Sequence, residues 1–278
     1  HCGASIGICQ GGGAGKYLAQ WMVHGQAEIN MREFDPRRFG NWATKDYVTE
    51  VSIADYHHMY YCYRPGEQHT VGRGLRKSSL HEKLKSHGAQ FSQIFGWERA
   101  RWYDPSGQGE EFSFKRSNWF DAVRAEAMAV RESVGLMDLS TFAKFDVTGK
   151  DAYNFLLRIC ANKIPTRDGG IILGHLLNEN GFIESEITVT RLGQEHFYVL
   201  SAAVAQVHDK DQLEWRKKPG EAVEVTDITD EFGVLVLAGP LAREVLQLCT
   251  TSDLSNAGFR WLTGKAAMVA GVNIRLLR

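Results

Sequence analysis

A glycine-rich segment near the N-terminus is the first feature that could do chemistry. The run Gly11-Gly-Gly-Ala-Gly15 leads into residues 16–24, where apolar side chains recur at helical spacing. Glycine lets a backbone approach a ligand closely, and the N–H groups and dipole of a helix N-terminus attract anionic or electron-rich groups. The pattern therefore predicts a turn that leads into a helix and could face such a group. A purely structural turn would use the same glycines.

Two carboxylates, Glu184 and Glu186, lie two residues apart in a segment that is typical of a β-strand. Side chains at alternate positions of a strand point to the same face, so we expect both to share one face of a sheet. A carboxylate there could accept hydrogen bonds from a ligand and stabilise positive charge on it. The alternative is that both are ordinary solvent-facing strand residues.

Neither the cysteines nor the histidines form a metal-binding pattern. The odd number of cysteines and the absence of a CxxC pair indicate a reducing compartment, and we expect buried free thiols at Cys2, Cys9, Cys62, Cys160 and Cys249. The histidines show no ligand spacing with Cys, Asp or Glu, so we predict no metal.

The overall composition excludes two classes of partner. The formal net charge is -1, without the basic excess that nucleic-acid binding requires. The apolar runs are well under the roughly 18 residues that a membrane-spanning helix needs. We therefore predict neither a nucleic-acid nor a membrane partner.

The elements that must position these residues alternate between helix and strand, with hairpins among them. The turn Asn178-Glu-Asn-Gly181 joins two predicted strands and is a strong hairpin signal. Such a pattern is typical of an α+β fold with antiparallel sheet. We expect helices at 45–61, 79–87, 119–133, 151–159, 204–217 and 239–249, and strands at 90–97, 142–147, 169–177, 181–191, 196–201, 223–229, 234–238 and 269–278. The chain opens within glycine-rich sequence and closes without a turn signal, so we also expect a piece of a longer protein.

Three ordered groups of motifs resemble one enzyme family. The first group is Gly3-Ala-Ser-Ile-Gly7, the glycine run with Lys16-Tyr-Leu-Ala-Gln-Trp21, and Asp35-Pro-Arg-Arg-Phe-Gly40. It is similar to the end of the flavin domain of dimethylglycine and sarcosine dehydrogenases. The second group is Phe95-Gly-Trp-Glu98, Ser113-Phe-Lys-Arg-Ser-Asn-Trp-Phe-Asp121, Val134-Gly-Leu-Met-Asp-Leu-Ser140 and Lys144-Phe-Asp-Val-Thr-Gly149. The third is Ala161-Asn-Lys-Ile-Pro165, Leu177-Asn-Glu-Asn-Gly181, Glu184-Ser-Glu-Ile-Thr-Val189 and Val236-Leu-Ala-Gly-Pro240. The last two groups resemble the folate-binding domain of the glycine-cleavage aminomethyltransferase.

The resemblance implies a domain order and a reaction. Residues 1–40 would be the C-terminal remnant of an FAD-binding domain, residues 41–75 a central or linker region, and residues 76–278 a folate-binding domain truncated at its C-terminus. The enzyme would oxidise an N-methylated amino acid at FAD and pass the one-carbon unit to tetrahydrofolate. Its electron acceptor would be a flavoprotein or oxygen. Its compartment would be the mitochondrial matrix in a eukaryote and the cytoplasm in a bacterium.

The resemblance also assigns site residues. Gly7, Gly11, Gly12 and Gly13 would face the flavin, and Glu186 would be the catalytic folate-contacting carboxylate. Asn162 would shape the folate cleft, with a structural turn as the alternative. Aminomethyltransferases often carry Tyr where this chain has Leu173, and His175 is a candidate replacement for that contact. The chain lacks the GxGxxG dinucleotide fingerprint, so we do not expect it to hold FAD or act alone.

Two other functions stay open at this point. One is a folate-dependent aminomethyltransferase or demethylase without redox chemistry, which would have no reason to carry the flavin-type first 40 residues. The other is a non-catalytic folate-binding module, which Leu173 slightly favours. An acid at 186 and the intact loop at 161–165 argue against that module.

Overall fold

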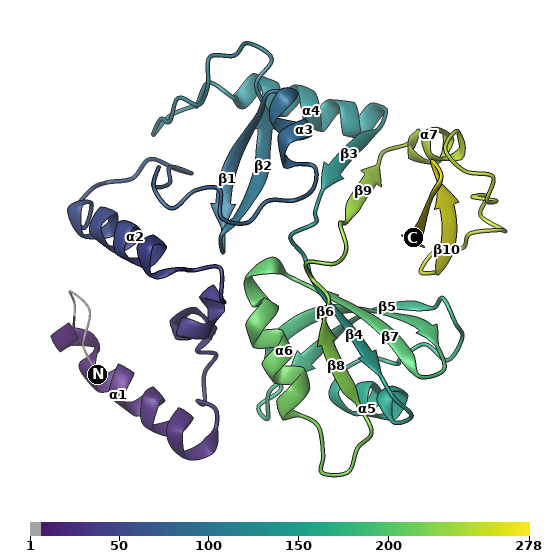
Figure 1. Ribbon diagram of the computed structural model, residues 1–278, viewed down its shortest axis with the longest axis horizontal. Coiled ribbons are helices and arrows are strands. Elements are labelled where there is room, and N and C mark those ends of the chain that lie inside the picture. Colours follow the sequence, from purple (N-terminus) through teal and green to yellow (C-terminus); the bar gives the residue numbers. More distant parts are fainter. Residues whose placement is uncertain (1–6) are drawn as a thin grey trace. The chain divides into compact units, whose positions relative to one another are not determined.

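The computed structural model describes residues 7–278, which divide after Arg38 into two units. The first unit holds helix α1 (Gly7–His24) and the short 3-10 turn η1 (Arg32–Phe34); a second such turn, η2 (Pro36–Phe39), spans the boundary (Figure 1). Pro36 opens η2, where its fixed φ and missing N–H cost nothing. The segment Gly3-Ala-Ser-Ile, which carries part of the flavin-domain resemblance, lies outside the described residues.

Helix α1 corrects the expectation of a glycine turn. Gly11, Gly12 and Gly13 lie inside the helix, which begins at Gly7. None of the three has a positive φ, and no atom lies within 4 Å of where a Cβ would stand on them. Nothing forces these glycines out of helical geometry, so the helix that Lys16–His24 favours extends back through them. The N–H groups left free at a helix start therefore belong to the first turn at Gly7, and not to the glycine run.

The centre of the second unit is a five-stranded antiparallel sheet with strand order β5-β6-β7-β4-β8 (Figure 1). Its strands are β4 (Ala143–Thr148), β5 (Ile171–Leu177), β6 (Ile183–Gly193), β7 (His196–Ser201) and β8 (Glu224–Asp227). Gly181, with φ +80, closes the predicted hairpin between β5 and β6. This sheet confirms the α+β fold with antiparallel pairing.

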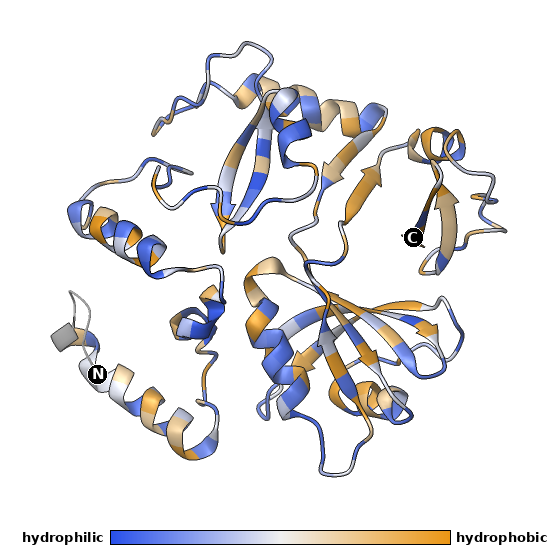
Figure 2. Ribbon diagram, viewed as in Figure 1, coloured by the Kyte–Doolittle hydropathy of each residue, from blue (hydrophilic) through white to orange (hydrophobic). Residues whose placement is uncertain are grey.

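One face of this sheet forms the hydrophobic core. Phe145, Val147, Val189, Phe197 and Val199 alternate along the strands and are fully buried. Helix α5 (Ala152–Ile159) covers them with Phe155 and Leu156, and helix α6 (Gln206–Trp215) adds Leu213. Figure 2 shows hydrophobic residues concentrated on α5 and on the strands of this sheet. Apolar side chains repeat every second residue along the strands and about every 3.6 residues along the helix, so each element has one apolar side, and these sides pack together.

The second unit also contains three two-stranded sheets, and each of them revises the predicted elements. The expected single strand at 90–97 is a hairpin, β1 (Ala89–Ile94) and β2 (Trp97–Tyr103), because Phe95 and Gly96 both take positive φ at a tight turn. The expected strand at 269–278 is shorter, β11 (Val272–Leu277), and it forms a hairpin with the unpredicted β10 (Gly264–Val269) through Ala270 and Gly271, which both take positive φ. Strand β3 (Gly135–Asp138), which pairs with β9 (Leu235–Ala238), was not predicted.

The remaining helices lie at the predicted places with shorter bounds. They are α2 (Lys45–His57), α3 (His81–Ser86), α4 (Phe120–Glu132) and α7 (Ala242–Gln247), and a short 3-10 turn, η3 (Ala203–Ala205), precedes α6. Thr44 caps α2 by accepting a hydrogen bond from the Tyr47 N–H at 3.3 Å. No helix within residues 7–278 has both the length and the apolar character to cross a membrane.

The expectation of buried thiols is wrong for most of the described cysteines. Cys160 is buried in the core, whereas Cys9, Cys62 and Cys249 are exposed on helix α1 and on loops. All four are free thiols. Cys2 lies outside the described residues.

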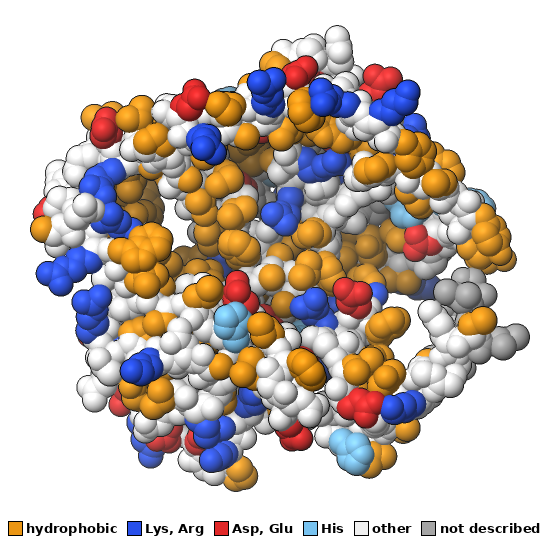
Figure 3. Space-filling view, turned by 180° about the vertical axis from the view of Figure 1, so that it is seen from behind, with side chains coloured by type: hydrophobic (Ala, Val, Ile, Leu, Met, Phe, Trp, Pro, Cys, Tyr) orange, Lys and Arg blue, Asp and Glu red, His pale blue; other side chains and the backbone are white. Residues whose placement is uncertain are grey.

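Many large hydrophobic side chains also remain exposed, and Figure 3 shows such side chains on one face of the protein.

Candidate functional site

The β5–β6 pair brings two of the predicted folate residues together. His175 and Glu186 are direct cross-strand partners, and His175 Nε2 lies 3.3 Å from Glu186 Oε2. Both point away from the core, with 34% of the His175 side chain and 61% of the Glu186 side chain exposed. The arrangement leaves a carboxylate free to accept hydrogen bonds from a ligand, with an imidazole beside it.

Asn162 lies beside the same strand pair and supports it from the loop after α5. Its Nδ2 donates a 2.6 Å hydrogen bond to the Leu173 carbonyl, and its Oδ1 accepts from the Lys163 N–H at 2.7 Å. The Ala161 N–H donates to the His175 carbonyl at 2.8 Å. Asn162 therefore fixes the loop to the edge of β5, which agrees with a shaping role and with the structural alternative alike. Leu173 is half exposed on the same strand.

The other end of this outer sheet face is covered by the C-terminal hairpin. Thr190 and Tyr198, partners in the β6–β7 ladder, are buried there. The Arg275 guanidinium from β11 stacks on the Tyr198 ring at 4.6 Å and on the Phe232 ring at 4.5 Å. Burial raises the pKa of Tyr198 to about 12. The end that carries Glu186 and His175 keeps both of these side chains exposed.

Strand β5 is held close to α5 by a glycine. A Cβ on Gly174 would stand 2.2 Å from Cys160 Sγ and 3.1 Å from Ile172 Cδ1. The thiol is buried, and burial raises its pKa. Gly174 thus lets the backbone before His175 approach the thiol closely.

We expect Gly174→Ala to destabilise the chain by about 2 kcal/mol, because overpacking a filled core costs in that range. Chemical denaturation would measure the change in the free energy of unfolding. Gly193→Ala is the control, since no atom lies within 4 Å of its Cβ position. Adding Cys160→Ala should restore most of the loss. If it does not, the contact with Sγ is not the cause.

Glu184 does not share the face of Glu186, contrary to expectation. The register shifts between Leu176, paired with Ser185, and Leu177, paired with Ile183, so Glu184 is an extra residue in a β-bulge. Its side chain is only 14% exposed and faces His208 of α6, whose Nε2 lies 3.7 Å from Glu184 Oε2. A bulge breaks the strict alternation on which the sequence argument rested.

A buried lysine is a feature that the sequence did not reveal. Lys144 in β4 is fully buried, and its Nζ donates hydrogen bonds of 2.7–2.9 Å to the carbonyls of Ser140, Phe142 and Thr229. Burial lowers its pKa to about 8, while the carboxylates of Asp230 and Asp227 act in the opposite direction. Its place in an alternating strand predicts only a polar face, so the pattern carried no signal for this burial.

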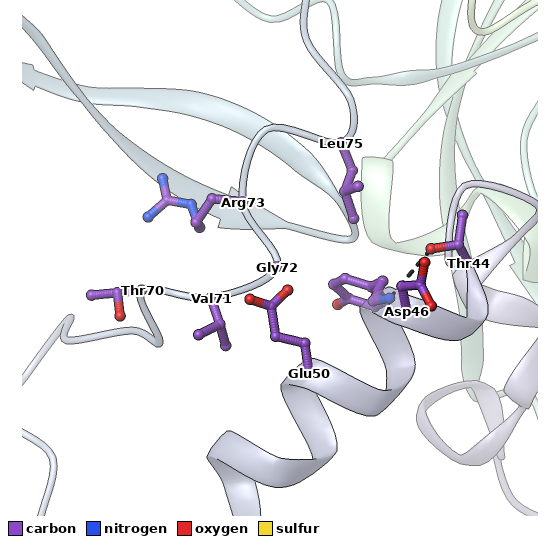
Figure 4. Close-up of a pocket in the computed structure, with 9 residues that line it drawn as sticks. Thr44, Asp46, Glu50, Thr70, Val71, Gly72, Arg73 and Leu75 are labelled. Carbon is purple, nitrogen blue, oxygen red and sulfur yellow. Dashed lines mark hydrogen bonds between the residues drawn. The ribbon is translucent and has the colours of Figure 1, made fainter.

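A hollow of about 410 Å³ lies elsewhere, between α2 and the segment at 70–75. Figure 4 shows Asp46 and Glu50 on the helix side and Val71 and Arg73 on the segment side. The Arg73 guanidinium is bound to the Glu98 carboxylate. None of the predicted site residues lines this hollow, and no cluster of three or more potential metal ligands occurs within residues 7–278.

Comparison with known protein families identifies two domains in this chain. The model of the GCVT N-terminal domain matches residues 80–278, and that of the FAD dependent oxidoreductase central domain matches residues 24–78. The chain belongs to the GCVT family. In its second unit it carries the GCVT N-terminal domain, preceded by the FAD-oxidoreductase central domain, which confirms the resemblance drawn from the motifs. The division of the chain at residues 40 and 75 stays a prediction.

Relatives of this GCVT chain include enzymes that act on methylated amino acids. It is 35% identical to dimethylglycine dehydrogenase of Mus musculus over 99% of this chain and 32% of that protein. It is 28% identical to sarcosine dehydrogenase of Homo sapiens over 99% of this chain and 34% of that protein. Both relatives are named as mitochondrial. The chain therefore spans about a third of the length of these relatives.

A solved structure supports the fold of the GCVT domain. The glycine cleavage system aminomethyltransferase T of Bartonella henselae superposes with a TM-score of 0.56 and 25% identity, over 69% of this chain and 47% of that one.

Proposed function

We propose that this chain is the folate-binding part of an FAD- and tetrahydrofolate-dependent dehydrogenase of N-methylated glycines, such as dimethylglycine or sarcosine. The observation that carries the proposal is the open end of the outer sheet face, where Glu186 is exposed beside His175, in a chain that matches both an FAD-oxidoreductase domain and a GCVT domain. A transferase without redox chemistry would not need the first of these domains.

The one-carbon chemistry would proceed in two steps. When bound, FAD would supply the oxidation, in which the N-methyl group loses a hydride and the substrate becomes an iminium ion. The iminium carbon would then form bonds to two tetrahydrofolate nitrogens, and the demethylated amine would leave. Both folate nitrogens lose their protons, one of which goes to the departing amine and the other to solvent. The electrons would pass on to a flavoprotein or to oxygen.

Glu186 fits the second step. An exposed carboxylate accepts hydrogen bonds from the N–H groups of a reduced pterin, and its charge stabilises the cationic one-carbon unit during transfer. Its imidazole neighbour His175 is on the same face and restricts the directions from which the carboxylate can be reached. Asn162 would hold the β5 edge against this site.

FAD would be held mainly by the part of the protein outside this chain, with Gly7, Gly11, Gly12 and Gly13 of α1 as the contact from this chain. Gly11, Gly12 and Gly13 carry no side chain, and no atom lies within 4 Å of their Cβ positions. The protein would work in the mitochondrial matrix of a eukaryote or the cytoplasm of a bacterium.

The experiment that tests the proposal is a titration of the complete protein that contains this chain. Its visible absorption is recorded while dimethylglycine and then sarcosine is added, and methylenetetrahydrofolate is measured in the presence of tetrahydrofolate. Bleaching of a flavin spectrum together with formation of that product is the expected result. A folded protein without flavin would exclude the dehydrogenase and leave a folate transferase.

Gly12→Ala tests the flavin contact. Alanine in place of glycine inside a helix should stabilise α1 by about 0.5–1 kcal/mol. If the flavin lies against this surface, the added methyl group should weaken FAD retention by the complete protein about tenfold. Helix stability is followed by circular dichroism and FAD retention by fluorescence of released flavin. Gly15→Ala, equally open in the same helix, is the control. FAD retention by Gly12→Ala equal to that of the unchanged protein would remove Gly12 from the flavin site.

A further inference from the structure

The start of helix α6 holds a partly buried group of charges that the proposed reaction does not use. His208 Nδ1 lies 2.9 Å from Asp209 Oδ1, and His208 Nε2 faces Glu184 at 3.7 Å. The side chains of His208, Asp209 and Glu184 are only 13%, 1% and 14% exposed. The His208 imidazole therefore lies between two carboxylates, within hydrogen-bond distance of Asp209 and facing Glu184. This places a side chain of α6 directly against the bulged residue of β6.

The same helix contacts the opposite strand of the bulge. Arg216, directly after α6, donates from Nη2 to the Leu177 carbonyl at 2.9 Å and to Gln212 Oε1 at 3.0 Å. Burial lowers the pKa of Arg216, and the Glu184 carboxylate opposes that shift. Asn178 Nδ2 donates to Glu184 Oε1 at 3.2 Å from the hairpin loop. Both strands are thus held at the point where their register shifts.

This register decides where Glu186 points. Side chains alternate along a strand, so a slip by one residue would move Glu186 to the core face and bring Ser185 opposite His175. A bulge changes the face of the sheet to which the following side chains point. The bulge at Glu184 therefore determines which residues of β6 face outward beyond the hairpin loop. Glu186 lies two residues beyond the bulge.

We propose that His208 and Arg216 are positioning residues for Glu186: by holding the bulge at Glu184 and Leu177, they fix the register that keeps the Glu186 carboxylate beside His175. The statement about register stands on the structure alone, and its consequence for one-carbon transfer rests on the proposed function. Neither side chain needs to touch a ligand.

Hydrogen–deuterium exchange tests the register part without any ligand. In His208→Leu, amides at 176–187 should exchange at least tenfold faster than in the unchanged chain, because Glu184 loses the polar side chain that faces it from α6. His208→Gln should restore slow exchange, since its Nε2 can still donate to Glu184. Lys210→Gln on the same helix is the control. Unchanged exchange in His208→Leu would overturn the proposal whatever the protein catalyses.

Activity of the complete protein tests the consequence. His208→Leu should lower the yield of methylenetetrahydrofolate about tenfold and release the one-carbon unit as formaldehyde, with unchanged flavin reduction, and His208→Gln should recover most of the yield. Faster exchange with an unchanged yield would show that the bulge does not position Glu186, and would overturn the proposal. If the unchanged protein makes no methylenetetrahydrofolate, the proposed function fails, while the exchange data still decide whether the register is held.

Discussion

Glu186→Ala in the complete protein should lower formation of methylenetetrahydrofolate about 100-fold, in the range typical of losing a general acid–base or charge-stabilising group. Flavin reduction by the amine should be unchanged, because the oxidation would take place away from this strand. The unused one-carbon unit should appear as formaldehyde. Product analysis by chromatography, combined with stopped-flow absorption of the flavin, separates the two half-reactions.

Conservative changes at the same position distinguish charge from shape. Glu186→Gln keeps the size but removes the charge, and should lose nearly as much yield as Glu186→Ala. Glu186→Asp keeps the charge on a side chain one methylene shorter, and should stay within about tenfold of the unchanged protein. Glu179→Ala, an exposed glutamate in the neighbouring hairpin loop, is the control. A normal yield from Glu186→Ala with normal flavin reduction would end the role that we assign to this carboxylate.

Lys144→Met should destabilise the second unit by about 3 kcal/mol at neutral pH. Two effects compete. Methionine removes a buried charge, whose lowered pKa corresponds to a burial cost of about 3 kcal/mol. It also leaves three buried carbonyls without their donor, at about 2 kcal/mol each. The lost hydrogen bonds outweigh the relieved charge. Urea denaturation measures the difference, with exposed Lys150→Met as the control; equal stability of the two variants would contradict it.

The stability difference between the unchanged chain and Lys144→Met should depend on pH. The pKa of Lys144 is about 8 in the folded chain and returns to its ordinary 10.5 on unfolding. Between these values the unfolded chain binds more protons, so this group makes the free energy of unfolding rise with pH. We expect the difference to grow by about 1 kcal/mol from pH 7.5 to pH 9. Denaturation series at the two pH values check it, and a constant difference would show that Lys144 keeps its proton throughout.

Several elements could be predicted because their signals are local. Strand β7 (His196–Ser201) has its predicted bounds, and the hairpin of β5 and β6 follows from its Asn-Glu-Asn-Gly turn. Helix α5 begins one residue from its predicted start because its apolar residues have a clear helical period. The hairpins at Phe95 and Ala270 were missed because a non-glycine residue takes positive φ in each turn. Such residues rarely adopt this conformation, so the local sequence does not predict a turn there.

In the candidate site, too, some features could be predicted from the sequence and others could not. Motif order identified the family and pointed to Glu186, His175 and Asn162, and the structure brings these three to one strand pair. The placement of Glu184 could not be predicted, because the bulge that turns it toward α6 depends on pairing between distant strands.

By itself, the sequence determined the fold class, the order of the two domains and the positions that could carry chemistry. Periodicity, turn residues and motifs are local features of the sequence, so they can be recognised without the structure. Tertiary structure alone decided three further points: that the glycine run is helix, that Lys144 is buried among three carbonyls, and that α6 holds the register of β6. The last two depend on what one segment meets from another far along the chain, whereas the glycine run is helical because nothing around it stops the helix from continuing. Such contacts are set by packing and by satisfied buried polar groups, which no local pattern encodes.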